Sequence, residues 1–318
     1  MSSNFNLLKN GFFAPLTHLS IIQVEGEDAA QFLHSQFSND IVQLAPHQLR
    51  FAGYCTAKGR LLATLFIWQT NNCFFLQLPT EIASTILKRL QMFVLRAKVR
   101  LTLMDSENVL LGIGGTKAPT ILEKWFNLPE PMHITEDNMG TLLRHPDALE
   151  VPFFQWLIPS QQLNQILPEL SHVLSMGSEA TWDLSRIYAG IPQIELATQE
   201  QFVPQSVNLE LIHGVSFKKG CYPGQEIVAR MHYLGKPKRR MLCATIHTPH
   251  AAPSMEVYSA NDPSQPCGMI VNAEKNTDNE FICLVEIQLS ALQHDIFLGS
   301  TAREQLHFHN LPYEISNE

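Results

Sequence analysis

Short runs of apolar residues, some of them alternating with polar ones, recur along this chain, and segments with helical spacing lie between them. Short apolar or alternating runs bounded by turn residues predict strands, whereas an apolar period near 3.6 residues predicts helices. Up to residue 200 this pattern places strands at 19–24, 51–56, 61–68, 73–78, 99–103, 109–113 and 153–158. Because hairpins and packed helices are mixed along the chain, we expect an α+β fold rather than a doubly wound parallel sheet.

Helices are expected where a capping or turn residue precedes helical spacing. Their expected first residues are Asp28, Thr80, Pro119, Ser160 and Ser178. The helix from Ser160 is predicted to end near Pro168, because proline lacks the N–H that continues a helix. The run Gly112-x-Gly114-Gly115 follows a strand without a phosphate-loop lysine, so it is interpreted as a turn.

The pattern changes after Arg240, where short strand candidates follow one another without helices. They cover 241–246, 255–259, 268–272, 281–287 and 306–308, with Pro, Asn, Asp and Ser at the turns between them. This is typical of a small all-β barrel or sandwich. We therefore place the main domain boundary near residues 238–242.

The bulk composition narrows the class of protein. The 318 residues allow two or three domains, and a hydrophobic content of 45% is enough for a sizeable core. Neither a signal peptide at residues 1–16 nor a membrane-spanning run is visible. The six cysteines form no C-x-x-C pair, so we expect no metal site, reduced thiols and a cytoplasmic location.

The charge is unevenly spread over the chain. Residues 218–240 hold seven basic residues against one acid, a net +6, which leaves −14 for the rest of a chain whose total is −8. Such a basic island suggests an anionic partner, whether a carboxylate-bearing cofactor, a phosphate or a nucleic acid. The alternative is a solvated basic turn. Lys236, Lys238, Arg239 and Arg240 are expected to face solvent, and wide duplex contact is not expected of an acidic protein.

The run Lys218–Glu226 places Cys221 between two glycines, Gly220 and Gly224, and next to Lys219. Glycines permit positive φ and close approach of a ligand, and a helical pattern follows directly. A helix N-terminus and an ammonium both favour a thiolate. The alternative is a buried, inert cysteine. A Cys/His pair for acyl transfer is also conceivable, with no means of choosing the histidine from the sequence.

Around this run the chain closely resembles the signature of the YgfZ family of folate-binding, tRNA-modifying proteins, which are similar in fold to the aminomethyltransferase (T-protein) of glycine cleavage. The matching residues are Gln201–Gln205, Asn208–Glu210, Gly214–Glu226, Arg230 and Gly235. Further landmarks are Gly26, Asp28-Ala29, Asn39-Asp40, Lys58–Arg60, Trp182, Ala189–Pro192 and Leu311–Tyr313. The resemblance extends over nearly the whole chain.

The resemblance implies a three-lobed fold around a central hole. Residues 1–240 would form two interwoven α+β lobes that bind tetrahydrofolate, and residues 241–318 a C-terminal β-barrel. It also implies a role in maintaining iron–sulfur enzymes, among them one that thiomethylates tRNA. Cys221 is the implied key functional residue, with Lys219 beside it; Tyr222 and Gln225 of the same run are candidates for cofactor binding.

Three further residues are candidates for holding the folate. Trp182 could stack on the pterin or pack in the core. Glu195 could accept the pterin's N–H groups or be a solvated loop acid. Arg230 could neutralise the folate glutamate tail or pair with Glu226 four residues earlier on a helix.

One departure from the aminomethyltransferases bears on activity. Those enzymes carry an acidic pair where this chain has Leu61–Thr64, so aminomethyl transfer is not expected. The sequence favours an accessory protein that acts through Cys221, binds folate and contacts iron–sulfur enzymes or their assembly factors. It is expected to be a monomer with indirect or weak tRNA contact. The alternatives are a tetrahydrofolate-dependent one-carbon transferase and a module that binds tRNA directly through 218–240.

Overall fold

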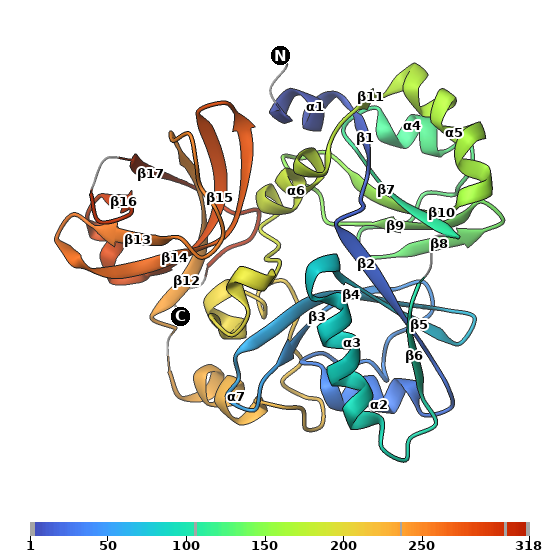
Figure 1. Cartoon of the computed structure of the whole chain (residues 1–318), viewed down its shortest axis with the longest axis horizontal. Coiled ribbons are helices and arrows are strands. Elements are labelled where there is room, and N and C mark those ends of the chain that lie inside the picture. The colour runs from blue at the N-terminus through green and yellow to red at the C-terminus, as the bar shows by residue number, and fades with distance from the viewer. Residues whose placement is uncertain (1–3, 105–106, 236, 302–303, 316–318) are drawn as a thin grey trace. The chain divides into compact units, whose positions relative to one another are not determined.

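The computed structural model describes residues 4–104, 107–235, 237–301 and 304–315, without the side chain of residue 234 (Figure 1). The chain forms two compact units. The first contains Met1–Leu33, Ile41–Arg50 and Leu65–Ser185, and the second His34–Asp40, Phe51–Thr64 and Arg186–Glu318. Each unit is therefore built from segments that are far apart in the sequence.

The first unit contains a six-stranded sheet in the order β11-β1-β7-β10-β9-β8. Its strands are β1 (Phe12–Pro15), β7 (Asn108–Gly114), β8 (Ile134–Asp137), β9 (Gly140–Arg144), β10 (Phe153–Pro159) and β11 (Ser175–Met176). Trp156 of β10 pairs with Leu111 of β7, and both belong to one core with residues of α4 (Ala118–Leu122) and α5 (Ser160–Val173). The two helices thus cover one face of this sheet (Figure 1). Helix α1 (Asn4–Asn10) precedes β1.

A second sheet has the order β3-β4-β5-β2-β6. Its strands are β2 (Leu19–Glu25), β3 (Leu49–Cys55), β4 (Leu61–Thr70), β5 (Cys73–Pro79) and β6 (Arg100–Leu103). Strands β3 and β4 continue from one unit into the other, as does helix α2 (Ala29–Gln36). Helix α3 (Thr80–Val94) buries Ile82, Ile86 and Leu90, which share one face because they recur at helical spacing.

Helix α6 (Glu179–Tyr188) begins in the first unit and ends in the second, where short 3₁₀ turns η1 (Leu196–Thr198) and η2 (Pro204–Val207) and helix α7 (Gln225–Leu234) follow. Asn208 fastens this region to the next strand. Its side-chain amide donates to Met241 O at 2.7 Å and accepts from Met241 N at 3.3 Å. The Tyr313 hydroxyl, close to the end of the described chain, donates to Gly190 O at 2.8 Å.

The second unit also contains a closed six-stranded barrel in the order β12-β15-β14-β13-β16-β17. The strands are β12 (Arg239–Ile246), β13 (Glu256–Ser259), β14 (Asp262–Thr277), β15 (Glu280–Gln288), β16 (Ile296–Leu298) and β17 (Glu304–His309), with η3 (Leu289–Gln293) after β15. Closure leaves no free strand edge. The inward-facing residues, such as Val257, Ile270 and Val285, form a separate apolar core.

The predicted α+β class and the C-terminal barrel are confirmed, whereas two local predictions are wrong. Helix α5 continues through Pro168 to Val173, because Ile166 and Leu170 on its buried face bind it to the core. Gly112 and Gly114 lie within strand β7 rather than in a turn. A Cβ at Gly114 would lie 2.4 Å from Cδ1 of Phe153, so this glycine allows close packing instead.

The predicted boundary between residues 240 and 241 stays a prediction. No helix in the described ranges combines the length and the apolar character that crossing a bilayer requires.

Candidate functional site

The run Lys218–Glu226 forms a loop that leads into α7, and Gly224 fixes its turn. Gly224 has φ +82°, and a Cβ there would lie 2.5 Å from Thr56 O and 2.6 Å from the Cα of Gly59. Any other residue would therefore meet backbone that cannot move aside, as well as an unfavourable φ. This close approach anchors the end of the loop against the turn between β3 and β4.

Cys221 is exposed, whereas the other five cysteines, all within the described residues, are buried. Burial raises the pKa of the Cys55 and Cys243 thiols to about 12. These thiols stay protonated at neutral pH and are enclosed by apolar neighbours, so they are poor nucleophiles. The alternative of an inert buried cysteine at position 221 does not describe this structure.

Lys219, with 8% of its surface exposed, reaches back to the end of α2. Its Nζ donates to Phe37 O at 2.7 Å and to His34 O. A cation is favourable here because carbonyls at a helix C-terminus carry partial negative charge. The Nζ atom also lies 4.8 Å from the centroid of the Tyr222 ring. Burial lowers the pKa of Lys219 to about 8, although the charges of Asp40 and Cys221 oppose this shift.

Tyr222 and Gln225 hold the loop in shape. Tyr222 is buried, which raises the pKa of its hydroxyl above the ordinary value. The backbone N–H of Gln225 donates to Tyr222 O at 3.2 Å, and Gln225 is the first residue of α7. Ligand contact by either residue stays a prediction.

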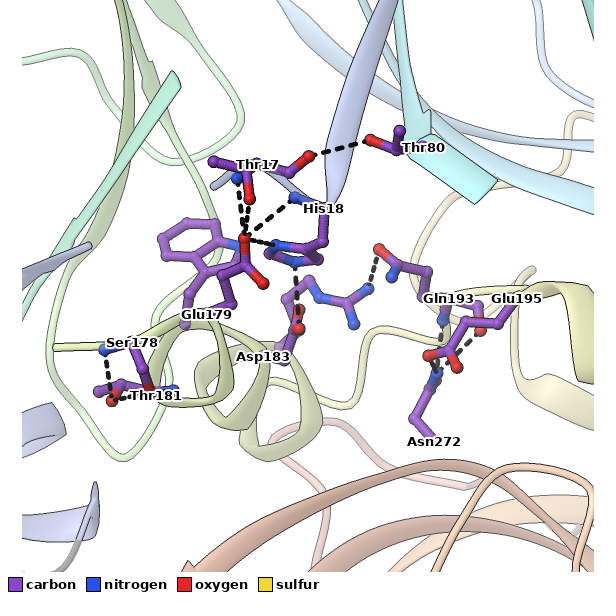
Figure 2. Close-up of polar contacts among 12 residues, drawn as sticks. Thr17, His18, Thr80, Ser178, Glu179, Thr181, Asp183, Gln193, Glu195 and Asn272 are labelled. Atoms are coloured by element: carbon purple, nitrogen blue, oxygen red, sulfur yellow. Dashed lines mark hydrogen bonds and ion pairs between the residues drawn. The ribbon is translucent and has the colours of Figure 1, made fainter. Parts of the chain in front are cut away.

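Glu195 is a half-buried carboxylate with defined partners (Figure 2). Asn272 of β14 donates to Glu195 Oε1 at 2.7 Å, and the same amide donates to Gln193 O at 2.9 Å. Glu195 and Thr198 also cap η1 reciprocally. The solvated-loop alternative therefore does not apply. Contact between Glu195 and a pterin stays a prediction.

Trp182 has no exposed surface. A Cβ at Gly112 would lie 2.6 Å from the indole Cε3, and the rings of His145 and Phe153 meet it edge-on at 5.3 and 6.4 Å between centroids. Trp182 is therefore packed in the core, which was the second of its two interpretations. Its indole has room because Gly112 carries no β-carbon. Its buried Nε1–H lacks an acceptor among the described residues. Stacking on a pterin stays a prediction.

Arg230 is exposed and lies 3.2 Å from Glu226 Oε1, one turn earlier in α7. Because exposed pairs of this kind contribute only about 0.3–0.5 kcal/mol, we expect Arg230→Ala to change the free energy of unfolding by less than about 0.5 kcal/mol. Urea unfolding measures this change. A loss of folate affinity in the same variant, seen by calorimetry, would assign Arg230 to the ligand; unchanged affinity would leave it as the helix pair alone.

The expectation that the last residues of the basic island face solvent is wrong for Arg240. Its side chain is 6% exposed and donates to Gln205 O at 2.9 Å and to the carboxylate of Glu210, whose side chain is 11% exposed. Burial raises the pKa of Glu210, and the nearby Arg240 charge opposes the shift. Arg239 is half-buried and pairs with Glu286 at 2.7 Å. Lys236 lies outside the described residues. Two of the seven basic residues of the island, Arg239 and Arg240, therefore form ion pairs at the start of β12, the first strand of the barrel.

Buried residues occupy the stretch Leu61–Thr64, where the acidic pair of the aminomethyltransferases is missing from this chain. Leu61, Leu62 and Ala63 are buried at the start of β4, and the Thr64 hydroxyl donates to Pro192 O at 3.1 Å while it accepts from Ile194 N at 3.1 Å. Thr64 thus fixes the turn that precedes Glu195. No carboxylate occurs in this stretch, so the structure offers no acid there for amine chemistry.

The second unit also has a cavity of about 670 Å³, large enough for a small molecule. None of the seven predicted site residues is among the described residues that line it. Charged side chains of both signs do so, namely Arg60, Lys238, Arg239, Glu256 and Glu286. The expected folate residues and this cavity therefore do not coincide.

No pattern in the sequence predicted a polar cluster that the structure shows in the first unit (Figure 2). His18 lies with Nδ1 3.3 Å from Glu179 Oε1 and Nε2 3.1 Å from Asp183 Oδ2. Backbone N–H groups of Thr17 and His18 also donate to Glu179 Oε1 at 2.9 and 3.1 Å. Burial alone would raise the pKa of Glu179, but the hydrogen bond from the Thr17 hydroxyl, the His18 charge and the hydrogen bonds from His18 lower it overall. The cluster binds the start of α6 to the segment before β2.

Comparison with known proteins defines the class. Residues 11–135 match the model of the GCVT N-terminal domain. The chain is similar in structure to the glycine cleavage system aminomethyltransferase T from Bartonella henselae, with a TM-score of 0.80 and 16% identity, over 97% of this chain and 88% of that one. At this identity the similarity shows the fold alone. The predicted aminomethyltransferase-like fold is thereby confirmed, and this chain has the fold of the T-protein.

Two relatives narrow the class. The tRNA-modifying protein YgfZ from Blochmanniella pennsylvanica is 30% identical over 233 residues, which are 72% of this chain and 70% of that protein. The tRNA-modifying protein YgfZ from Shigella sonnei is 28% identical over 303 residues, 93% of this chain and 91% of that protein. This chain belongs to the family of the tRNA-modifying protein YgfZ, as its signature run predicted.

Proposed function

We propose that this protein is a tetrahydrofolate-binding accessory protein of tRNA modification, in which the thiol of Cys221 acts in the maintenance of iron–sulfur enzymes. The observation that carries the proposal is the exposure of Cys221 alone among six cysteines, on a loop anchored by Gly224 and Lys219. Membership of the YgfZ family supports the link to tRNA modification.

Three residues organise the thiol in this proposal. Gly224 sets the turn, Tyr222 is buried beneath the loop, and Lys219 ties it to the end of α2. Because these contacts hold the backbone on either side of Cys221, the sulfur can face a partner without the loop being reordered first.

Glu195 is the residue best suited to hold the folate. Its carboxylate would accept N–H groups of the pterin while Asn272 keeps it oriented. Bound tetrahydrofolate supplies a reduced ring whose nitrogens can carry one-carbon groups. Arg230 and Trp182 remain candidates for further contacts, through the glutamate tail and the ring respectively.

The two alternatives have less support. A one-carbon transferase would need a carboxylate near the folate amine, and the buried stretch Leu61–Thr64 supplies none. A module that binds tRNA directly would use the basic island, but the guanidiniums of Arg239 and Arg240 are paired with Glu286 and Glu210. We therefore propose that its partners are proteins, namely iron–sulfur enzymes or their assembly factors. We also propose that the protein is a cytoplasmic monomer whose contact with tRNA is indirect or weak.

The test is complementation of cells that lack the gene. Wild type should restore tRNA thiomethylation and iron–sulfur enzyme activity under oxidative stress, whereas Cys221→Ala should restore less than about a tenth of either. Cys267→Ser is the matched control, because a hydroxyl can replace the Cys267 thiol as donor to Val257 O. Full restoration by Cys221→Ala, at equal protein level, would refute the role of this thiol.

A further inference from the structure

The loop that carries Cys221 lies next to a histidine and a carboxylate that the sequence did not connect with it. His34 is in the last turn of α2, and its Nδ1 lies 3.1 Å from Oδ1 of Asp40. The two side chains are 13% and 26% exposed. An imidazole held by a carboxylate through one ring nitrogen has a fixed orientation, and its other nitrogen is free to act on a third group.

The other nitrogen points toward the loop. A Cβ at Gly220 would lie 3.7 Å from Nε2 of His34, the one described atom within 4 Å that does not belong to residues 219–221. Cys221 is the next residue of the loop, and consecutive Cα atoms are about 3.8 Å apart, so the thiol is attached one residue from the position that this nitrogen faces. Lys219 on the other side of Gly220 feels the charges of both Asp40 and Cys221. The four polar groups thus lie around one short segment of backbone.

The charge state of His34 suits it to accept a proton. Burial and the neighbouring Lys219 charge lower the pKa of His34, although Asp40 opposes the shift. The imidazole is therefore neutral at pH 7. With Asp40 beside Nδ1, the proton of the neutral ring belongs on Nδ1, which leaves the lone pair on Nε2.

We propose that His34 is the general base for the Cys221 thiol and that Asp40 is its positioning residue. The S–H bond of Cys221 breaks, its electron pair stays on sulfur, and the proton passes to Nε2 of His34. The thiolate and the imidazolium so formed attract each other, and Asp40 stabilises the imidazolium from the far side. This acid–base pair rests on the proposed function in one respect: it concerns the same Cys221 thiol.

The competing possibility is that His34 only completes α2 and that its nearness to Gly220 has no effect on sulfur. His232 lies on α7, the helix that follows the loop, and its ring stacks on Phe217 with 3.7 Å between centroids. It therefore serves as the matched control. A structural role for His34 predicts altered stability but no change in how the reactivity of Cys221 depends on pH.

The test is the rate at which iodoacetamide alkylates Cys221, followed by mass spectrometry between pH 5.5 and 9.5. In this reaction sulfur attacks the methylene carbon and iodide leaves, so the rate reports the thiolate. We expect His34→Gln to slow the reaction at pH 7 about tenfold, equivalent to a shift of one pH unit in the profile. Asp40→Asn should shift the profile less, and His232→Gln not at all. Overlapping profiles of wild type and folded His34→Gln would overturn the proposal, as would a shift caused by His232→Gln.

If His34→Gln does not fold, NMR titration of the His34 ring in wild type and in Cys221→Ser replaces it. The titration midpoint should differ between the two if the sulfur and Nε2 share a proton, and equal midpoints would overturn the proposal. Neither measurement uses folate or cells. If Cys221→Ala complements fully but the pH profile shifts in His34→Gln, the proposed function is refuted and the His34–Cys221 pair stands. If Cys221→Ala fails to complement and the profiles overlap, the proposed function stands and the pair is refuted.

Discussion

Trp182→Ala is expected to lower the free energy of unfolding by about 3–5 kcal/mol. The indole is fully buried and fills the space above Gly112, with His145 and Phe153 edge-on to it. Neighbours in a packed core relax only partly around a lost ring, so a cavity adds to the lost burial. Urea unfolding followed by circular dichroism measures the change.

Trp182→Phe is the control, because it keeps an aromatic ring against Gly112 and should lose less than half as much stability. Calorimetric titration of both variants with tetrahydrofolate separates packing from binding. If Trp182→Ala keeps wild-type stability and loses tetrahydrofolate affinity, the indole is a ligand contact and its place in the core is misassigned.

Lys219→Met should destabilise the protein by about 2 kcal/mol at pH 7, since Phe37 O and His34 O lose a charged donor. The effect should grow with pH. Burial lowers the pKa of Lys219 from 10.5 to about 8, so between these values the unfolded chain holds a proton that the folded protein has released. Wild-type stability therefore gains up to about 3 kcal/mol from Lys219 as the pH rises through this interval.

Urea unfolding at intervals from pH 7 to pH 10.5, in wild type and Lys219→Met, measures this difference. Lys218→Met is the matched control, because Lys218 is exposed and the substitution should have little effect at any pH. A difference between wild type and Lys219→Met that stays constant or shrinks above pH 8 would contradict the buried position of the amine.

Local patterns in the sequence predicted most of the fold. Apolar runs bounded by turn residues located strands such as β4 and β5, and the change of pattern after Arg240 predicted the barrel that follows. The signature run predicted the turn at Gly224 and the helix after it. Pro168 misled the prediction of α5, because its local penalty is smaller than the burial of Ile166 and Leu170 on the same helix.

The polar partners could not be predicted, because they come from distant segments. The side chain of Arg240 meets Glu210, 30 positions earlier, and Lys219 reaches the carbonyl of Phe37, 182 positions earlier. Helical spacing likewise leaves open whether Trp182 faces a core or a pocket, since both require an apolar face. Only the fold brings His34 beside Gly220, and no periodicity connects them.

A reactive thiol at position 221 underlies both the proposed function and the proposed base, and mass-spectrometric mapping of iodoacetamide adducts on the native protein tests its reactivity directly. At pH 8 and a short reaction time, we predict one adduct per chain, located on Cys221, with the five buried cysteines unmodified until urea is added. An unmodified Cys221, or labelling of Cys55 or Cys243 at a comparable rate in the folded protein, would contradict it.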